Sequence, residues 1–128
     1  MIGAQGRVAV FAYRRPVDLR KGFEGLGALV REALAQDPLS GALYLFTNRR
    51  RTTAKVLHFD GTGLGLYIKR LARGRFAALW DDAAPASLSL TRTELDLFLQ
   101  GSHLVGKVVL APAPLSEKDL VVRARGDH

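Results

Sequence analysis

The sequence predicts a single α+β domain in which a mainly antiparallel sheet packs against two or three helices. Short apolar runs rich in aromatic and branched residues are separated by polar turns, which is typical of strands. Two other stretches repeat their apolar residues at helical spacing. The chain has 128 residues, 48% of them hydrophobic, which is enough for one core. We expect this core to span about residues 7–110 and a flexible extension to follow at about 111–128.

The N-terminal third of the chain predicts one strand and one helix. Residues 7–13 are apolar on both alternating faces, as in a strand covered on both sides, so we assign them to the centre of the sheet. Pro16 ends this strand, and Asp18 stands where it can cap a helix that ends near Asp37. The apolar positions of that helix are Phe23, Leu26, Leu29, Val30 and Leu34.

A hairpin and a second helix are predicted next. Leu43–Thr47 and Thr53–Phe59 have the composition of strands, and the polar residues 48–52 between them predict a hairpin loop. In residues 63–73, apolar side chains recur both at helical spacing and at every second position, so a helix and a strand are both compatible with the pattern. We favour the helix, with Gly74 as its C-terminal cap.

The remaining predicted elements lie between residues 76 and 110. Residues 76–80 and residues 107–110 each predict a short strand. Thr91 and Glu94 have the spacing of a capping box, in which each side chain binds the backbone N–H of the other residue. We therefore expect a helix that begins after Thr91 and ends by Gly101.

Positive charge is concentrated in the first 80 residues. These hold 14 Lys and Arg against 5 Asp and Glu, a net +9, whereas residues 81–128 hold 5 against 7, a net −2. Such a one-sided distribution is the footprint of a protein that binds a polyanion, and it favours nucleic acid as the partner. Most of these cations are arginine, whose planar fork can hold a phosphate at two points. The alternative is a solvated basic surface that binds nothing.

The cations form four clusters, which we take as the candidate nucleic-acid interface. The candidate residues are Arg14, Arg15, Arg20, Lys21, Asn48, Arg49, Arg50, Arg51, Lys55, Lys69, Arg70, Arg73 and Arg75. We expect the three consecutive arginines to occupy the tip of a mobile hairpin. The more rigid platform beside it is expected to consist of Arg20, Lys21, Lys69, Arg70, Arg73 and Arg75. Tyr13 and Tyr67 lie beside basic clusters and are the aromatic residues best placed to stack on bases.

Enzymatic and metal-dependent functions find little support in the sequence. The absence of cysteine excludes disulfides and thiolate-bound zinc. The histidines His58, His103 and His128 form no metal-ligand motif, and neither a catalytic triad nor a cluster of carboxylates is evident. The glycine-rich residues 61–65 match no nucleotide-binding motif, and no apolar run is long enough to span a membrane. We therefore predict a soluble cytoplasmic protein without catalytic residues, metal or cofactor.

Three segments together resemble a known family. Residues 18–26, 46–61 and 69–76 are similar, in this order, to the TnpB-type accessory proteins encoded by the second open reading frame of IS66-class bacterial insertion sequences. This family is distinct from the RNA-guided nuclease that shares the TnpB name. The resemblance covers roughly residues 8–101. The matching residues are Arg20, Lys21, Gly22 and Gly25, then Asn48, Arg49, Arg50 and Lys55, and finally Lys69, Arg70, Gly74, Arg75 and Phe76.

The resemblance implies a small non-catalytic protein needed for transposition, encoded beside a separate transposase that carries the DDE-type chemistry. Together with the basic clusters, it leads to the hypothesis of an accessory factor that binds DNA phosphates at insertion-sequence ends or at the target. The alternative is an adaptor that docks onto the transposase, or onto another protein of the element, without direct DNA contact. Charge alone does not distinguish direct DNA binding from docking onto the transposase.

Overall fold

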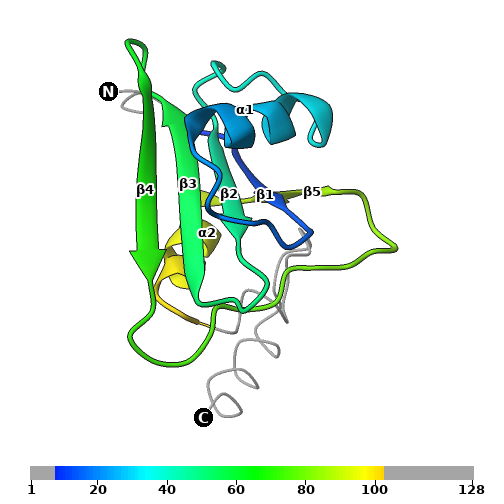
Figure 1. Ribbon diagram of the computed structural model, residues 1–128, viewed down its shortest axis with the longest axis vertical. Coiled ribbons are helices and arrows are strands. Elements are labelled where there is room, and N and C mark those ends of the chain that lie inside the picture. The colour runs from blue at the N-terminus through cyan, green and yellow to red at the C-terminus, as the bar shows by residue number, and fades with distance from the viewer. Residues whose placement is uncertain (1–7, 103–128) are drawn as a thin grey trace, which may run out of the picture.

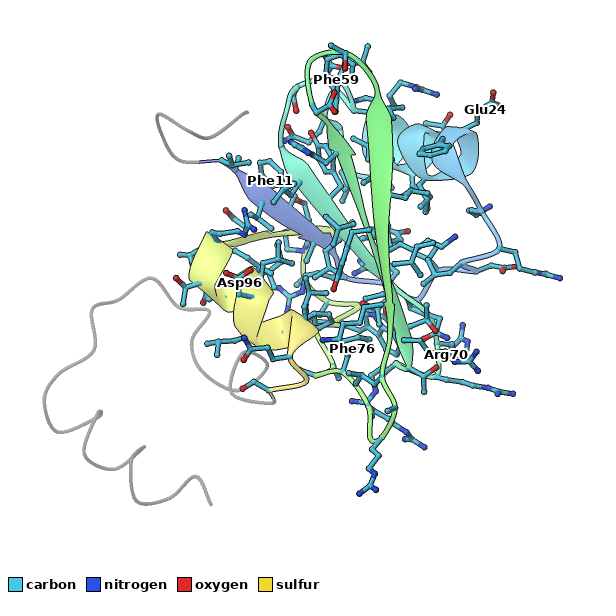
Figure 2. All side chains as sticks on the ribbon, turned by 90° about the vertical axis from the view of Figure 1, so that its left-hand side faces the viewer. Phe11, Glu24, Phe59, Arg70, Phe76 and Asp96 are labelled. Carbon is cyan, nitrogen blue, oxygen red and sulfur yellow. The ribbon has the colours of Figure 1, made fainter. Side chains whose placement is uncertain are left out.

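The computed structural model describes residues 8–102, which form a five-stranded sheet with one helix on each face (Figures 1 and 2). The strands run in the order β4-β3-β2-β1-β5, and the β1–β2 pair alone is parallel. The predicted α+β class with a mainly antiparallel sheet is confirmed. The predicted strand at 107–110 and the extension at 111–128 lie outside the described residues. The elements are β1 (Val10–Tyr13), α1 (Phe23–Glu32), β2 (Leu43–Thr47), β3 (Thr53–Phe59), β4 (Leu64–Arg70), β5 (Ser87–Leu90) and α2 (Arg92–Leu99).

The β1–α1–β2 unit and the β2–β3 hairpin form the centre of the sheet. Parallel neighbours need a crossover connection, and α1 supplies it between β1 and β2. The prediction of an internal strand near the N-terminus is confirmed, because β1 lies between β2 and β5 and begins, among the described residues, at Val10. The hairpin strands have the predicted bounds, and residues 48–52 form the loop between them.

Each face of the sheet has its own apolar core. Side chains alternate between the two faces of a strand, so Tyr44 and Phe46 pack with Leu26 and Val30 of α1, while Leu45 packs on the opposite face. On the α2 face, the aromatic rings of Phe76 and Phe98 stack with their centroids 4.9 Å apart. This division explains why every residue of β2 is buried.

The structure confirms the capping of α2 and contradicts the predicted capping of α1. Thr91 and Glu94 form both hydrogen bonds of the capping box, and the turn after the helix reaches Gly101, whose φ is 86°. Helix α1 instead begins after Gly22, which offers no side-chain cap, and it ends at Glu32, five residues before the predicted end. Asp18 lies upstream of α1 and is bound to Arg20.

The prediction of a helix over residues 63–73 is wrong. Residues 64–70 form β4, which pairs with all seven residues of β3. The turn before it is held by the carboxylate of Asp60, which accepts hydrogen bonds from the backbone of Thr62 and Gly63. The alternating apolar residues therefore follow the strand period, and Gly74, with a φ of 74°, lies in the loop after β4 instead of capping a helix.

The region between β4 and α2 also differs from the prediction. Residues 76–80 are not a strand, although Phe76, Ala77 and Leu79 are buried in the core of the α2 face. Residues 87–90, for which no strand or helix was predicted, form β5 and pair with β1. Within residues 8–102, neither helix has the length and apolar character needed to cross a bilayer.

Candidate nucleic-acid interface

Arginines from three separate segments line one open hollow at the end of the sheet that carries the β2–β3 loop. The hollow has a volume of about 840 Å³. Figure 2 shows Arg70 near this end of the sheet, on the side that carries α1. We call this hollow, with Arg20, Arg49, Arg50 and Arg70 in its lining, the basic hollow. It brings together parts of all three segments that the sequence analysis singled out.

Strand pairing explains why these segments meet. Arg70, the last residue of β4, lies directly opposite Thr53, the first residue of β3, and opposite residues of an antiparallel pair point to the same face. The segment that carries Arg20 is drawn to the same place, because the backbone N–H of Val17 donates to the carbonyl oxygen of Thr47 over 3.0 Å. The basic hollow is thus built on backbone hydrogen bonds of the sheet and its margins.

Asn48 shapes the hairpin loop. Its Oδ1 accepts hydrogen bonds from the backbone N–H groups of Thr52 and Thr53, at 2.9 and 3.1 Å, and its Nδ2 donates to the hydroxyl of Thr52. Its side chain is therefore engaged within the loop, even though Asn48 lines the basic hollow. Arg49 and Arg50 project from the loop that Asn48 holds, and both are exposed.

Arg51 differs from its two neighbours. Its backbone has a φ of 58°, its guanidinium donates to the carbonyl oxygen of Phe76, and its own carbonyl oxygen accepts from the Phe76 N–H over 2.7 Å. A further backbone bond joins Leu71 to Thr52. The expected mobile tip of three arginines is thus corrected: the loop is anchored to the segment after β4, and Arg51 is part of that anchor.

Arg20 has a carboxylate partner inside the basic hollow. Its Nε and Nη2 donate to Oδ1 and Oδ2 of Asp18, at 3.0 and 2.6 Å. This hydrogen-bonded guanidinium lowers the pKa of Asp18 well below its ordinary value of 3.8, and the carboxylate raises the pKa of Arg20. Asp18 therefore offsets the charge of Arg20. Asp18, the residue predicted to cap the helix, stands two residues before Arg20 in the sequence.

Lys21 and Lys55 extend the basic surface beside the hollow. The Nζ of Lys55 donates to the carbonyl oxygen of Lys21 over 3.1 Å. Lys55 lies two residues after Thr53 on β3, so it points to the same face of the sheet. The structure brings these two predicted residues together, and Lys21 is exposed.

Arg14 and Arg15 are engaged with the segment before β5. Arg14 donates to the carbonyl oxygen of Leu79 over 3.0 Å and lies 3.9 Å from a carboxylate oxygen of Asp81. Arg15 donates to the carbonyl oxygens of Asp81 and Ala84 and lies 3.7 Å from Asp82. Both guanidinium groups therefore fasten this segment to the end of β1, and neither lines the basic hollow.

The other predicted cations are placed apart from the basic hollow. Lys69 points to the α2 face, where it lines a second hollow of about 710 Å³ together with His58 and Tyr67. Arg73 and Arg75 are exposed on the loop that follows β4. Within residues 8–102, no three His, Asp or Glu side chains gather as a metal ion would require.

The two tyrosines proposed for base stacking lie in different settings. Tyr13 is partly buried, with its ring centroid 6.0 Å from that of Phe46. Tyr67 is 54% exposed, but it points to the α2 face, away from the basic hollow. Neither tyrosine lines the basic hollow. Its lining does include Thr52 and Thr53, which were not among the predicted site residues.

Comparison with known proteins decides the family. A family model described as "IS66 Orf2 like protein" matches residues 8–107. The chain belongs to this family. Two relatives of this chain occur in Sinorhizobium fredii (strain NBRC 101917 / NGR234). The "Uncharacterized protein y4hO" is 35% identical over 101 residues, covering 79% of this chain and 86% of the relative. The "Uncharacterized protein y4jC" is 32% identical over 101 residues, covering 79% and 85%.

The family membership confirms the resemblance seen in the three sequence segments. It makes this chain an insertion-sequence protein, which suggests an accessory role in transposition, and the family is not a known catalytic one. No solved structure matches the chain.

Proposed function

We propose that this IS66 Orf2-like protein is a non-catalytic accessory factor in transposition that binds the DNA backbone through the basic hollow. The observation that carries the proposal is the convergence of Arg49, Arg50 and Arg70 on one open surface. Within residues 8–102, none of these three guanidinium groups has an ion pair or a hydrogen-bond partner. Their donors are available to a ligand.

Phosphate is the ligand that this chemistry favours. A free guanidinium presents a planar fork that can hold two phosphate oxygens, and three such groups on one surface suit the repeated phosphates of a nucleic-acid strand. Phosphate contacts position a protein on DNA without reading bases, so we expect affinity with little sequence preference. With about six phosphates engaged, log affinity should fall with log salt at a slope of about −5.

The test is a fluorescence-anisotropy titration of the full chain with duplexes from an insertion-sequence end and of unrelated sequence. Arg50→Glu should weaken binding to both duplexes and make the salt slope shallower. Arg31→Glu is the matched control, because Arg31 is an exposed arginine of α1 that does not line the basic hollow. Equal losses in the two variants would show that net charge, and not this hollow, is responsible.

The same variants separate DNA binding from an adaptor role. The element's transposase is mixed with wild-type, Arg50→Glu or Arg31→Glu protein, and capture is measured alongside DNA binding. Loss of transposase capture with unchanged DNA affinity in Arg50→Glu would contradict the proposal and identify the hollow as a protein-docking surface. Absence of DNA binding at low salt would overturn it as well.

A further inference from the structure

The two edges of the sheet are built differently. One edge is β5, which has four residues, two of them serine. The other is β4, with seven residues, where Tyr67 and Ile68 are 54% and 55% exposed. Figure 1 shows β4 along the left-hand side of the sheet, and no helix or strand of residues 8–102 lies beyond it. A long edge strand with exposed apolar side chains is a template for pairing with another strand.

The hydrogen bonds of the β3–β4 pair show which backbone groups of β4 are open. The N–H of Asp60 donates to the carbonyl oxygen of Gly63, and the N–H of Leu71 donates to that of Thr52. Hydrogen-bonded and non-bonded pairs alternate along an antiparallel ladder, so residues 65, 67 and 69 also bond to β3. The backbone groups of Leu64, Leu66, Ile68 and Arg70 therefore point away from β3, toward the open edge.

From this pattern we propose that β4 pairs antiparallel with β4 of a second copy of the chain, in a register centred on Tyr67. Leu66 then lies opposite Ile68 of the second copy, and Leu64 opposite Arg70. In this register, the four residues whose backbone groups point away from β3 lie opposite the same four residues of the second copy. Each can therefore form both backbone hydrogen bonds of the ladder. Leu66 and Ile68 of both copies form one apolar strip, and the two Tyr67 side chains meet at the two-fold axis.

The charges of β4 select this orientation. Lys69 and Arg70 lie together at one end of the strand. In parallel self-pairing they would face the same cations of the second copy, and like charges directly opposite are destabilising. In the antiparallel register, Lys69 lies opposite Gly65 of the second copy and Arg70 opposite Leu64. The strand is thus complementary to itself, which favours a second copy as the occupant of the edge.

The paired sheets would place both basic hollows on one side. Opposite residues of an antiparallel pair point to the same face, so the α1 helices of the two copies cover the same face of a continuous sheet. This surface would offer DNA two sets of free arginines. The dimer itself does not depend on DNA binding.

Sedimentation velocity of the full chain over a concentration series is the first test. We expect a monomer–dimer equilibrium that shifts toward dimer as salt increases, because each chain carries a net charge of +7 and salt screens the repulsion. DNA affinity should change in the opposite direction. The two proposals can therefore fail separately. A monomer at every concentration and salt level would overturn the dimer.

A matched pair of variants locates the interface. Ile68→Lys adds a cation to the centre of the proposed strip and should weaken dimerisation by roughly tenfold or more. Leu39→Lys adds the same charge at a side chain of similar exposure, 53%, outside the sheet edge, and should leave dimerisation nearly unchanged. Equal behaviour of the two variants would place the dimer contact elsewhere.

The absence of cysteine in the natural chain allows the register to be tested directly. In the proposed register, residue 67 faces itself as a non-hydrogen-bonded pair with a Cα–Cα distance of about 4.5 Å, which a disulfide can span. Tyr67→Cys should give a covalent dimer when diamide removes two electrons and two protons from the two thiols. Lys69→Cys should not, because residue 69 faces Gly65 of the second copy. A dimer that forms without Tyr67→Cys cross-linking would contradict this register.

Discussion

Arg49–Arg50 and Arg14–Arg15 are both adjacent pairs of arginines, and the structure places them in opposite settings. Arg49 and Arg50 are exposed in the basic hollow and have no partner within residues 8–102. Arg14 and Arg15 are partly buried and bound to carbonyl oxygens and carboxylates of residues 79–84. The comparison shows that a sequence cluster sets the number of cations, while distant partners decide whether their charge is available to a ligand.

The largest expected effect comes from removing the free arginines. Replacing Arg49, Arg50 and Arg70 together by alanine should change the salt slope of DNA binding from about −5 to about −3, since each phosphate contact contributes about 0.9. The free energy of unfolding should change by less than about 0.5 kcal/mol, because within residues 8–102 these side chains have no ion-pair or hydrogen-bond partner. Anisotropy and urea unfolding measure the two quantities. A large loss of stability would erase the distinction between the two arginine pairs.

The opposite result is expected for the bound pair. Replacing Arg14 and Arg15 by alanine leaves the carbonyl oxygens of Leu79 and Ala84 without their donors. The double variant should lower the free energy of unfolding by about 2 kcal/mol. Its DNA affinity should stay within about twofold of wild type, since these side chains do not line the hollow. A loss of DNA affinity as large as that of the triple variant would contradict the assignment of Arg14 and Arg15 to the stability of the fold and not to DNA binding.

Arg51 sharpens the comparison within the hairpin itself. Arg51→Ala removes a hydrogen bond to the Phe76 carbonyl oxygen and should cost about 1 kcal/mol of stability in urea unfolding. Its effect on DNA affinity should be smaller than that of Arg50→Ala, which serves as the neighbouring control. The reverse ranking would show that Arg51 leaves its anchor when DNA binds.

A smaller effect is expected from converting a paired arginine into a free one. Asp18→Asn removes the carboxylate that holds Arg20, so DNA affinity should rise by about two- to threefold and the salt slope should steepen by up to about 0.9. Combining Asp18→Asn with Arg20→Ala should abolish the gain. A gain that persists in the double variant would point to the loss of the negative charge itself.

The same carboxylate gives the fold a defined pH dependence. The pKa of Asp18 is lower in the folded chain than its ordinary value of 3.8. Its contribution to stability is therefore present above that ordinary value and is lost as the pH falls below it, toward the folded pKa. Urea unfolding at a series of acidic pH values should show less acid destabilisation in Asp18→Asn than in wild type. Identical pH profiles would mean that the ion pair contributes nothing measurable.

Local patterns predicted several elements correctly. The bounds of β2 and β3 follow from two apolar runs on either side of a polar loop, and α2 follows from the spacing of Thr91 and Glu94. These features depend on neighbouring residues, so a short window of sequence contains the information. The alternation of serine and leucine in residues 87–90 is a signal of the same kind, although no strand was predicted there.

The β4 segment shows where such patterns fail. Its apolar residues fit two periods, and the pairing of β4 with all of β3 decides between them. The predicted capping of α1 was wrong for a related reason. The carboxylate of Asp18 can accept hydrogen bonds either from the backbone N–H groups at a helix start or from a guanidinium, and in the structure it accepts them from Arg20. In both cases, two local solutions compete, and contacts outside the local window select one.

By itself, the sequence determined the α+β class, the family, the basic character of the first 80 residues and three of the segments that the structure brings together. Tertiary structure alone decided which cations are free. Arg14 meets Asp81, 67 residues further along the chain, whereas Arg49, Arg50 and Arg70 converge through the β2–β3–β4 ladder. The physical reason is that electrostatic interactions depend on distance in space, which folding sets through hydrogen-bonded strand registers and not through separation in the chain.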